Sequence, residues 1–212
     1  MKVYRQPRLG FSQQSINSLV NPNSSVLEMG CATGYMTRHF QEEMGCRVTA
    51  LDISEEQAEL ARPFAERVIV GDLSDDETWQ ELAGAYDHVI YADVLEHLAN
   101  PWLALERTKK LLKPDGTVIA SIPNIAYYKI RKQLLLGRFD YTESGIMDDT
   151  HLRFFTEKTA RDMFARAGYE IVNFERIYQV KTDRRLRWLC PNAFAYQFVI
   201  KGSLKSLSCP QI

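Results

Sequence analysis

Cysteine is scarce in this chain, and its few thiols are scattered. They are Cys31, Cys46, Cys190 and Cys209, and no two of them form a Cys-x-x-Cys pair or a paired zinc spacing. The missing spacing argues against a structural zinc site. Residues 1–5 do not read as a signal peptide, so we expect reduced thiols in a cytoplasmic protein.

Long apolar runs and an excess of one charge are also missing. No apolar run approaches the roughly 18 residues that a transmembrane helix needs, so we expect no transmembrane segment. The net charge of −1 argues against a protein that coats nucleic acid, and we expect no nucleic-acid partner. With 212 residues and 45% hydrophobic content, we expect a single domain over residues 1–212 with a sizeable core.

The most informative segment is Val-Leu-Glu-Met-Gly-Cys-Ala-Thr-Gly at residues 26–34. An apolar strand that contains Glu28 leads into a small-residue turn and then a helix, which brings backbone amides close to a ligand. Gly30 permits unusual backbone dihedrals, and Gly34 permits close approach. Ala32 and Tyr35 replace the second and third glycines of a dinucleotide-binding fingerprint, which argues against a dehydrogenase.

The order of predicted elements indicates an α/β fold. Strands alternate with helices, which predicts a parallel sheet with helices on both faces. Two β-rich runs at 170–180 and 194–201 have no helix between them, which predicts an added antiparallel hairpin. The remaining expected strands span residues 25–29, 47–51, 68–70, 86–92 and 117–122, the last preceded by a tight turn at 114–116. Three of the expected helices span residues 33–44, 100 to near 113, and 156–167. Two more are expected to start at the capping boxes 54–57 and 74–77.

A long connection at residues 124–155 does not belong to this minimal plan. Such connections are usually functional, and this one follows the carboxyl end of a strand, where ligands bind in open α/β sheets. We therefore expect it to roof the substrate. Its basic residues are Lys129, Arg131, Lys132 and Arg138, and a second group is Lys181, Arg184, Arg185 and Arg187. These residues would suit an anionic group of the substrate, such as a phosphate. The alternatives are that they form a solvated helix face or contact a membrane surface.

Two acids complete a family pattern. Asp52 and Asp72 end the second and third strands, and with the glycine turn they resemble the class I S-adenosylmethionine (SAM) methyltransferases over roughly residues 20–202. The resemblance implies a Rossmann-like, seven-stranded, mostly parallel sheet with an antiparallel last strand, and SAM as cofactor. The implied cofactor-binding residues are Glu28, Gly30, Cys31, Gly34, Asp52, Ile53, Asp72, Leu73, Ala92 and Asp93. Asp52 would accept both ribose hydroxyls, and Asp72 would accept the adenine amine or else start a helix.

The run Val-Leu-Glu-His-Leu at residues 94–98 also resembles many class I methyltransferases. Histidine as a residue type gains and loses a proton near neutral pH, so His97 suits a general base that deprotonates an attacking hydroxyl. The alternative is that Glu96 and His97 fix the loop by hydrogen bonding. We expect His88, inside a strand, to be structural and His39 to be solvated.

Residues 145–156, together with 136–141, resemble a bacterial methyltransferase subgroup found with glycosyltransferases and surface-polysaccharide enzymes. His151 in this segment is a second candidate for acid–base or substrate-binding work. The alternative is an internal latch that ties the insertion to the domain.

A divalent ion is a further question at Asp93, Glu96, His97 and His151. Small-RNA 2′-O-methyltransferases look similar here and bind an ion with such residues, and ubiquinone-pathway O-methyltransferases share the Glu-His pair. An ion could lower a hydroxyl pKa and hold a vicinal diol. Carboxylates and histidines at the edge of a site need not be ligands, so we assign no metal ligand.

The sequence therefore predicts a SAM-dependent methyltransferase that O-methylates a small polar acceptor, such as a sugar or nucleotide sugar. The alternatives are a metal-assisted O-methyltransferase of a phenol or terminal ribose, and a SAM-binding subunit without catalysis. The acceptor, the oligomeric state and the role of residues 203–212 stay open.

Overall fold

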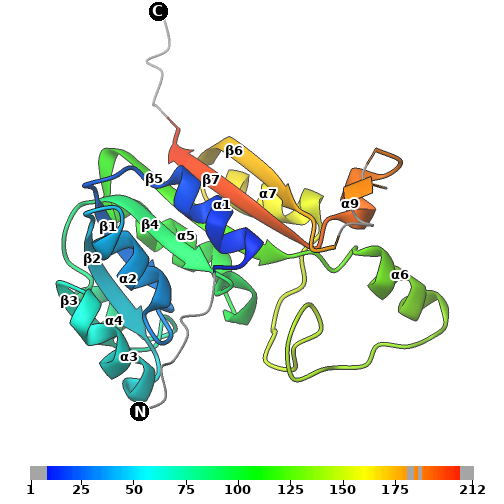
Figure 1. Ribbon diagram of the computed structural model, residues 1–212, viewed down its shortest axis with the longest axis horizontal. Helices are drawn as coiled ribbons and strands as arrows, with labels where there is room; N and C mark the ends of the chain where they lie inside the picture. The colour runs from blue at the N-terminus through cyan, green and yellow to red at the C-terminus, as the bar shows by residue number, and fades with distance from the viewer. Residues whose placement is uncertain (1–8, 181–183, 186–187, 206–212) are drawn as a thin grey trace, which may run out of the picture.

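A seven-stranded sheet forms the centre of the molecule (Figure 1). The computed structural model describes residues 9–180, 184–185 and 188–205. The strand order is β3-β2-β1-β4-β5-β7-β6, with β7 antiparallel to both of its neighbours. The strands are β1 (Ser25–Met29), β2 (Arg47–Asp52), β3 (Arg67–Val70), β4 (Tyr86–Ala92), β5 (Leu112–Pro123), β6 (Tyr169–Ile177) and β7 (Gln197–Leu204). This arrangement confirms the predicted Rossmann-like α/β fold.

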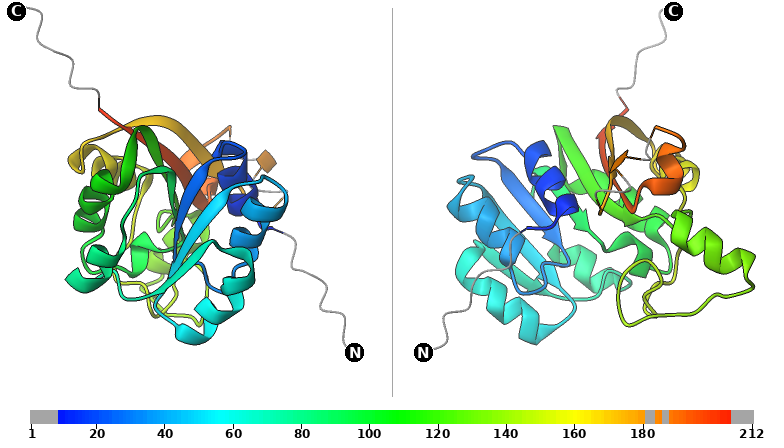
Figure 2. Two further views of the ribbon diagram at one scale, coloured as in Figure 1. Left: turned by 90° about the vertical axis from the view of Figure 1, so that its left-hand side faces the viewer. Right: turned by 45° about the vertical axis from the view of Figure 1, so that its right-hand side comes forward.

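Helices cover both faces of the sheet (Figure 2). The α-helices are α1 (Phe11–Leu19), α2 (Tyr35–Glu42), α3 (Glu55–Ala61), α4 (Asp76–Glu81), α5 (Pro101–Thr108), α6 (Tyr128–Leu135), α7 (Glu157–Arg166) and α9 (Pro191–Phe194). Within the described residues, the short 3₁₀ turns are η1 (Arg62–Phe64), η2 (Leu95–His97) and η3 (Lys109–Leu111).

Strand alternation divides most of the core into two large clusters, beside a small third one of Cys31, Ala50 and Ala61. Successive side chains of a strand point to opposite faces, so on β4 Ile90 packs with α1 and α2 while Val89 and Tyr91 pack with α5 and α7. The first cluster contains Ile16 and Phe40. All of these side chains are buried, so the sheet is held rigidly from both sides and its carboxyl edge is a stable platform for a site.

Two local predictions were wrong. Ser74 does not cap a helix, because its N–H donates to the Asp72 carboxylate at 2.7 Å and α4 takes Asp75 as its N-cap instead. The last two strands are not joined without a helix, because α9 lies between β6 and β7. The expected tight turn at 114–116 is present as an irregularity within β5: Leu112 pairs with Tyr86 and Thr117 with His88, and a Cβ on Gly116 would lie 3.0 Å from the backbone N and O of Lys113.

The connection between β5 and α7 leaves the body of the molecule as an arm (Figure 1). Asn124 and Phe155 pair at its base, and the Asn124 side-chain amide donates to the carbonyls of Asn192 and Ala195, each at 2.8 Å. The arm is therefore anchored to the segment that leads into β7. Nowhere in the described part of the chain is a helix long and apolar enough to cross a membrane.

Candidate functional site

The turn after β1 requires glycine at two positions. Gly30 has φ +74°, and a Cβ there would lie 2.6 Å from Cγ2 of Val94. Gly34 has φ +75°, and its Cβ would lie 2.5 Å from Cα of Ala61. L-residues with side chains rarely adopt this backbone region, so the two glycines let the turn pass under the β4 loop and let α2 approach α3.

Two acids at the ends of neighbouring strands line a first pocket. Asp52 is buried, and its two oxygens accept the backbone N–H groups of Ala32 at 2.7 Å and Ser54 at 2.9 Å. Each carboxylate oxygen has a second lone pair available for a ligand hydroxyl. Asp72 is half-buried at the same edge. The first pocket is lined by both acids together with Gly30, Ile53, Leu73, Val94 and His97.

Asp93 lies at the boundary between this pocket and a second one. Its φ of +57° places it in the left-handed region, which aspartate tolerates better than most residues. Its Oδ1 accepts the Ser121 hydroxyl and the Gln197 side-chain amide, both at 2.7 Å. Burial raises the pKa of its carboxyl group. Asp93 and His97 line both pockets, so the two cavities meet at these two side chains.

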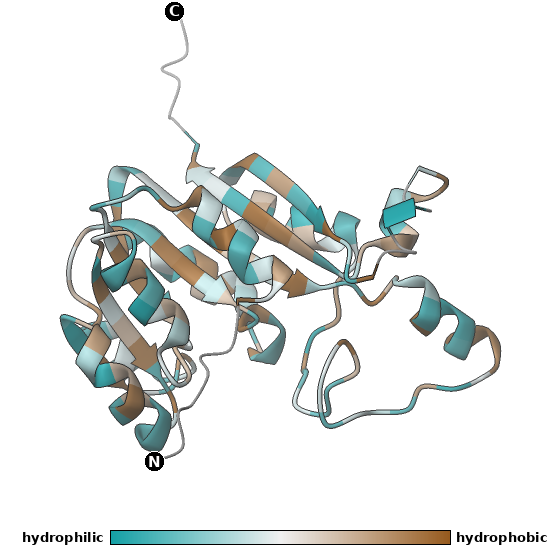
Figure 3. Cartoon of the chain, viewed as in Figure 1, coloured by the Kyte–Doolittle hydropathy of each residue, from teal (hydrophilic) through white to brown (hydrophobic). Residues whose placement is uncertain are grey.

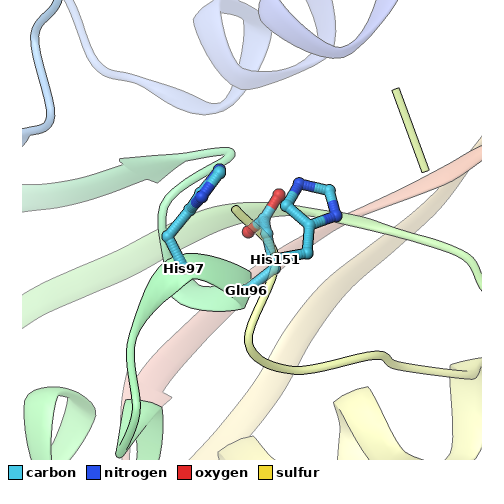
Figure 4. Close-up of side chains that lie close together, drawn as sticks. All are labelled: Glu96, His97 and His151. Atoms are coloured by element: carbon cyan, nitrogen blue, oxygen red, sulfur yellow. The ribbon is translucent and has the colours of Figure 1, made fainter. Parts of the chain in front are cut away.

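Two imidazoles and a carboxylate converge in the second pocket (Figure 4). The rings of His97 and His151 meet edge to face, with centroids 4.7 Å apart. Glu96 and His97 come from η2, whereas His151 comes from the insertion. One potential ligand atom from each of the three residues lies within 4.8 Å of the others.

Hydrogen bonds fix the tautomers of both imidazoles. The Thr150 hydroxyl donates to Asp148, so its oxygen must accept from Nδ1–H of His97, 3.0 Å away. Nδ1 of His151 donates to the carbonyl of Ile146 at 3.1 Å. In neutral imidazole the other nitrogen is then an acceptor. Both Nε2 atoms therefore carry a lone pair, and burial lowers the pKa of His151, which favours that neutral form.

Glu96 is the most unusual member of this group. Only 1% of the residue is exposed, and among the described residues neither carboxylate oxygen has a hydrogen-bond partner. Burial raises the pKa of its carboxyl group well above the ordinary value, and Asp93 adds to the effect. Its backbone carbonyl, by contrast, accepts the N–H groups of Leu152 and Arg153, each at 2.9 Å. A buried, unpaired carboxylate calls for a proton or a cation.

Some predicted site residues lie outside both pockets. Glu28 is buried beneath the turn, accepts the Thr37 hydroxyl at 2.6 Å, and has a pKa raised to about 8, mainly by burial. Cys31 is also buried, and burial raises its thiol pKa to about 12. Ala92 ends β4 in a half-buried position. Neither Glu28, Cys31 nor Ala92 is among the residues that line the two pockets.

The remaining histidines and basic residues also have defined places. His88 is structural, as predicted, because it bonds to Asn21 and Thr117. His39 is half-buried on α2 rather than fully solvated. None of the insertion's basic residues lines the second pocket. In the second basic group, Lys181 and Arg187 lie outside the described residues.

Sequence reasoning missed Ser121 and Gln197, the two partners of Asp93. A serine inside the apolar run of β5 is the only signal that pointed to this contact. Gln197 begins β7 and reaches Asp93 across 104 positions of sequence, a separation that no local pattern reveals.

Comparisons with known proteins give a consistent family. A family profile described as a methyltransferase domain matches residues 5–173. The ubiquinone biosynthesis O-methyltransferase of Bordetella pertussis is 31% identical over 197 residues, which cover 86% of this chain and 79% of that protein. The protein of the same name from Actinobacillus pleuropneumoniae is 30% identical over 126 residues, or 55% of this chain and 52% of that protein. This chain thus spans about half the length of several curated relatives that it matches.

A solved structure shares the fold. The 1,6-didemethyltoxoflavin-N1-methyltransferase of Burkholderia thailandensis, with bound 1,6-didemethyltoxoflavin and S-adenosylhomocysteine, superposes with a TM-score of 0.60. The identity is 23%, and the match covers 90% of this chain and 75% of the other. At this identity the likeness extends to the fold alone.

Proposed function

This chain belongs to the SAM-dependent methyltransferases, and we propose that it methylates a hydroxyl of a small acceptor bound in the second pocket. The observation that supports this proposal is that Asp93 and His97 line both pockets. A donor in the first pocket and an acceptor in the second would therefore meet at these residues. The name O-methyltransferase of two relatives favours oxygen as the accepting atom.

The first pocket would hold the donor. Asp52 would accept the ribose hydroxyls on its second lone pairs, and Asp72 with Leu73 would lie at the adenine. The turn at Gly30 would carry the amino-acid end. Glu28 would act indirectly, because it holds α2 against the turn through Thr37 and does not line the pocket.

His97 would act as the general base. Its Nε2 lone pair is available because Asp148 and Thr150 fix the proton on Nδ1. When bound, SAM supplies an electrophilic methyl group on its sulfonium. While the acceptor oxygen takes up this methyl group, Nε2 of His97 would take up the hydroxyl proton, and S-adenosylhomocysteine would leave as the product. In-line placement of the reactants is worth up to about 7–11 kcal/mol in model reactions.

The acceptor we favour is a sugar or nucleotide sugar in a cytoplasmic setting, as the subgroup resemblance of residues 145–156 implies. The test is transfer of a labelled methyl group from SAM to a panel of sugars, nucleotide sugars, phenols and catechols. His97→Ala should lower kcat by about 10²–10⁴-fold and leave S-adenosylhomocysteine affinity within about twofold by calorimetry. His39→Ala is the matched control and should retain activity.

Three outcomes would change the proposal. A loss below tenfold in His97→Ala would remove the general-base role. Transfer to phenols but not to sugars would replace the acceptor class. Tight cofactor binding without transfer to any acceptor would favour a regulatory subunit.

A metal-assisted reaction is the second candidate, and the unpaired Glu96 carboxylate favours it. Two imidazole nitrogens and one carboxylate suit Mn²⁺, Fe²⁺, Co²⁺ or Zn²⁺. Donation of the second ring N–H to a backbone carbonyl, as His151 does, is the usual support of a metal-bound histidine. An ion here would lower the pKa of an acceptor hydroxyl, and His97 would then be a ligand rather than the base.

Direct binding separates the two candidates. Wild-type protein should bind Mn²⁺ in calorimetry, Glu96→Gln should lose this binding, and Glu66→Gln, at an exposed position, should keep it. Activity should fall with a chelator and return with Mn²⁺. If neither the chelator nor added metal changes the activity, the general-base reaction stands and the metal candidate is rejected.

A further inference from the structure

The arm between β5 and α7 exposes a concentrated group of apolar side chains. Every residue from 131 to 145 is exposed, including Leu135 at 87% and Leu136 at 64%. Figure 3 shows the hydrophobic colour gathered at the end of α6, beyond a hydrophilic first part. The sheet and its cores lie elsewhere (Figure 1), so the fold itself offers these leucines no cover. Contiguous exposed apolar groups of this kind mark interaction sites.

Basic charge surrounds this apolar end. Lys129, Arg131, Lys132 and Arg138 lie within ten positions of sequence, and residues 124–139 contain no acid. The whole chain has a net charge of −1, so the arm is a local excess of positive charge rather than part of a basic protein. Cationic residues next to exposed leucines suit an anionic lipid surface, where headgroup phosphates meet acyl chains.

A second exposed segment lies close to the base of the arm. Trp188 is 76% exposed and Leu189 is exposed beside it, with Arg185 exposed a few residues earlier. The ring of Tyr128 at the start of α6 contacts the ring of Phe194 on α9, with centroids 5.2 Å apart. Figure 1 and the right view of Figure 2 place α6 and α9 on the same side of the molecule. Tryptophan and arginine are favoured at the level of lipid headgroups.

We propose that residues 128–141 dock this protein reversibly on an anionic lipid surface, with the leucines at the end of α6 entering the headgroup layer. Trp188 and Leu189 form a second point of contact. Contact at one face would hold the protein on the surface by several weak interactions, since no single element is apolar enough to anchor it alone. The following segment, Gly145 to His151, lines the second pocket, so docking would bring the acceptor side of the site near the lipid surface.

Vesicle sedimentation tests the apolar part of the proposal. The full chain should sediment with phosphatidylcholine vesicles that contain about 30% phosphatidylglycerol. It should sediment much less with vesicles of phosphatidylcholine alone. Leu135→Asp should lower binding at least about tenfold. Leu60→Asp, at an exposed leucine of α3, is the matched control and should bind like wild type.

Charge reversal tests the electrostatic part. Lys132→Glu combined with Arg138→Glu should lower the partition coefficient at least about tenfold, and added salt should weaken wild-type binding. Arg67→Glu combined with Lys110→Glu changes two exposed basic residues of the body and should have little effect. Circular dichroism should show that all four variants remain folded.

Several results would overturn the proposal. Equal binding to both vesicle types, or equal loss in the arm variants and their controls, would reject an anionic lipid surface. A concentration-dependent dimer that Leu135→Asp abolishes, without vesicle binding, would assign the arm to a second copy of the chain instead. Methyl transfer to soluble acceptors is measured separately, so failure of the docking proposal would leave the proposed function intact.

Discussion

His88 is a buried imidazole whose two nitrogens join different parts of the fold. Nε2 accepts the N–H of Asn21 at 3.1 Å, so Nδ1 donates to the Thr117 hydroxyl at 2.8 Å. The pKa is lowered to about 4, first by burial and then by Lys201 and Lys113, while Asp87 opposes the shift. The folded protein therefore holds His88 neutral at a pH where the unfolded chain would protonate it.

The first prediction concerns the pH dependence of stability. The pKa of His88 is lower in the folded protein than in the unfolded chain. The stability that neutral His88 contributes is therefore complete above pH 6.5 and is lost as the pH falls towards 4. The difference corresponds to about 3 kcal/mol in the free energy of unfolding. Urea unfolding at several pH values should show this loss in wild type and a flatter dependence in His88→Gln. Identical slopes in the two proteins would contradict the assignment.

The second prediction concerns two glycines with similar backbone angles. Gly34 has φ +75° and Gly137 has φ +70°, but an added Cβ meets the Ala61 backbone at position 34 and nothing within 4 Å at position 137. Gly137→Ala should cost about 1 kcal/mol through backbone strain alone. Gly34→Ala should cost clearly more, because α3 must also move. Chemical denaturation of both variants measures the difference in the free energy of unfolding. Equal losses would mean that α3 can move away from the added Cβ at no cost.

Several site residues were predictable because each ends a strand. Asp52, Asp72 and Asp93 follow apolar runs whose carboxyl ends meet at one edge of a parallel sheet, and the structure brings all three to the first pocket. The convergence of Glu96 with His151 was only raised as a question, because it depends on how the insertion folds back. The tautomers were not predictable, since they depend on Thr150 and Ile146.

At the scale of elements, capping signals gave one right and one wrong helix start. Ser54 accepts the N–H of Gln57 at 3.4 Å and begins α3 as predicted. The same pattern at Ser74 fails, because Asp72 captures the Ser74 N–H and the chain turns once more before α4. Helix α1 was not predicted; its contacts are with β5, β6 and β7, so tertiary packing rather than local sequence supports it.

The third prediction uses this pair of serines. Ser54→Ala removes an N-cap and should lower the free energy of unfolding by about 0.5–2 kcal/mol. Ser74→Ala removes a side chain that caps no helix, so the change should stay within about 0.5 kcal/mol. Thermal or urea unfolding of the two variants gives the comparison. A larger loss at Ser74 than at Ser54 would restore the capping box that the structure rejects.

At the scale of the whole molecule, different parts of the sheet support the first and the second pocket. The order β3-β2-β1-β4 presents the turn and acids of the first pocket, whereas β5, β7 and the insertion surround the second. The alternation of strands and helices predicted this sheet and its antiparallel end. It did not predict the path of the insertion, because the contacts that place it join residues that no periodic pattern links. Examples are the Asn124 amide with the Asn192 and Ala195 carbonyls and the Phe139 ring with the Phe154 ring.

The fourth prediction tests whether the two pockets act separately. S-adenosylhomocysteine at 100 times its Kd should stabilise the folded state by about 2.7 kcal/mol, which raises Tm by roughly 5–10 °C in a chain of this size. Asp52→Ala removes a charged acceptor worth about 1.5–3 kcal/mol, so most of this rise should disappear at the same ligand concentration. Gln197→Ala removes one hydrogen bond to Asp93, from a residue that lines the second pocket only. This variant should therefore keep the rise in Tm but have a lower kcat. Scanning fluorimetry together with the transfer assay measures both quantities. If Gln197→Ala loses the rise in Tm as well, Asp93 couples the two pockets into one binding unit and the division between donor and acceptor sides is wrong.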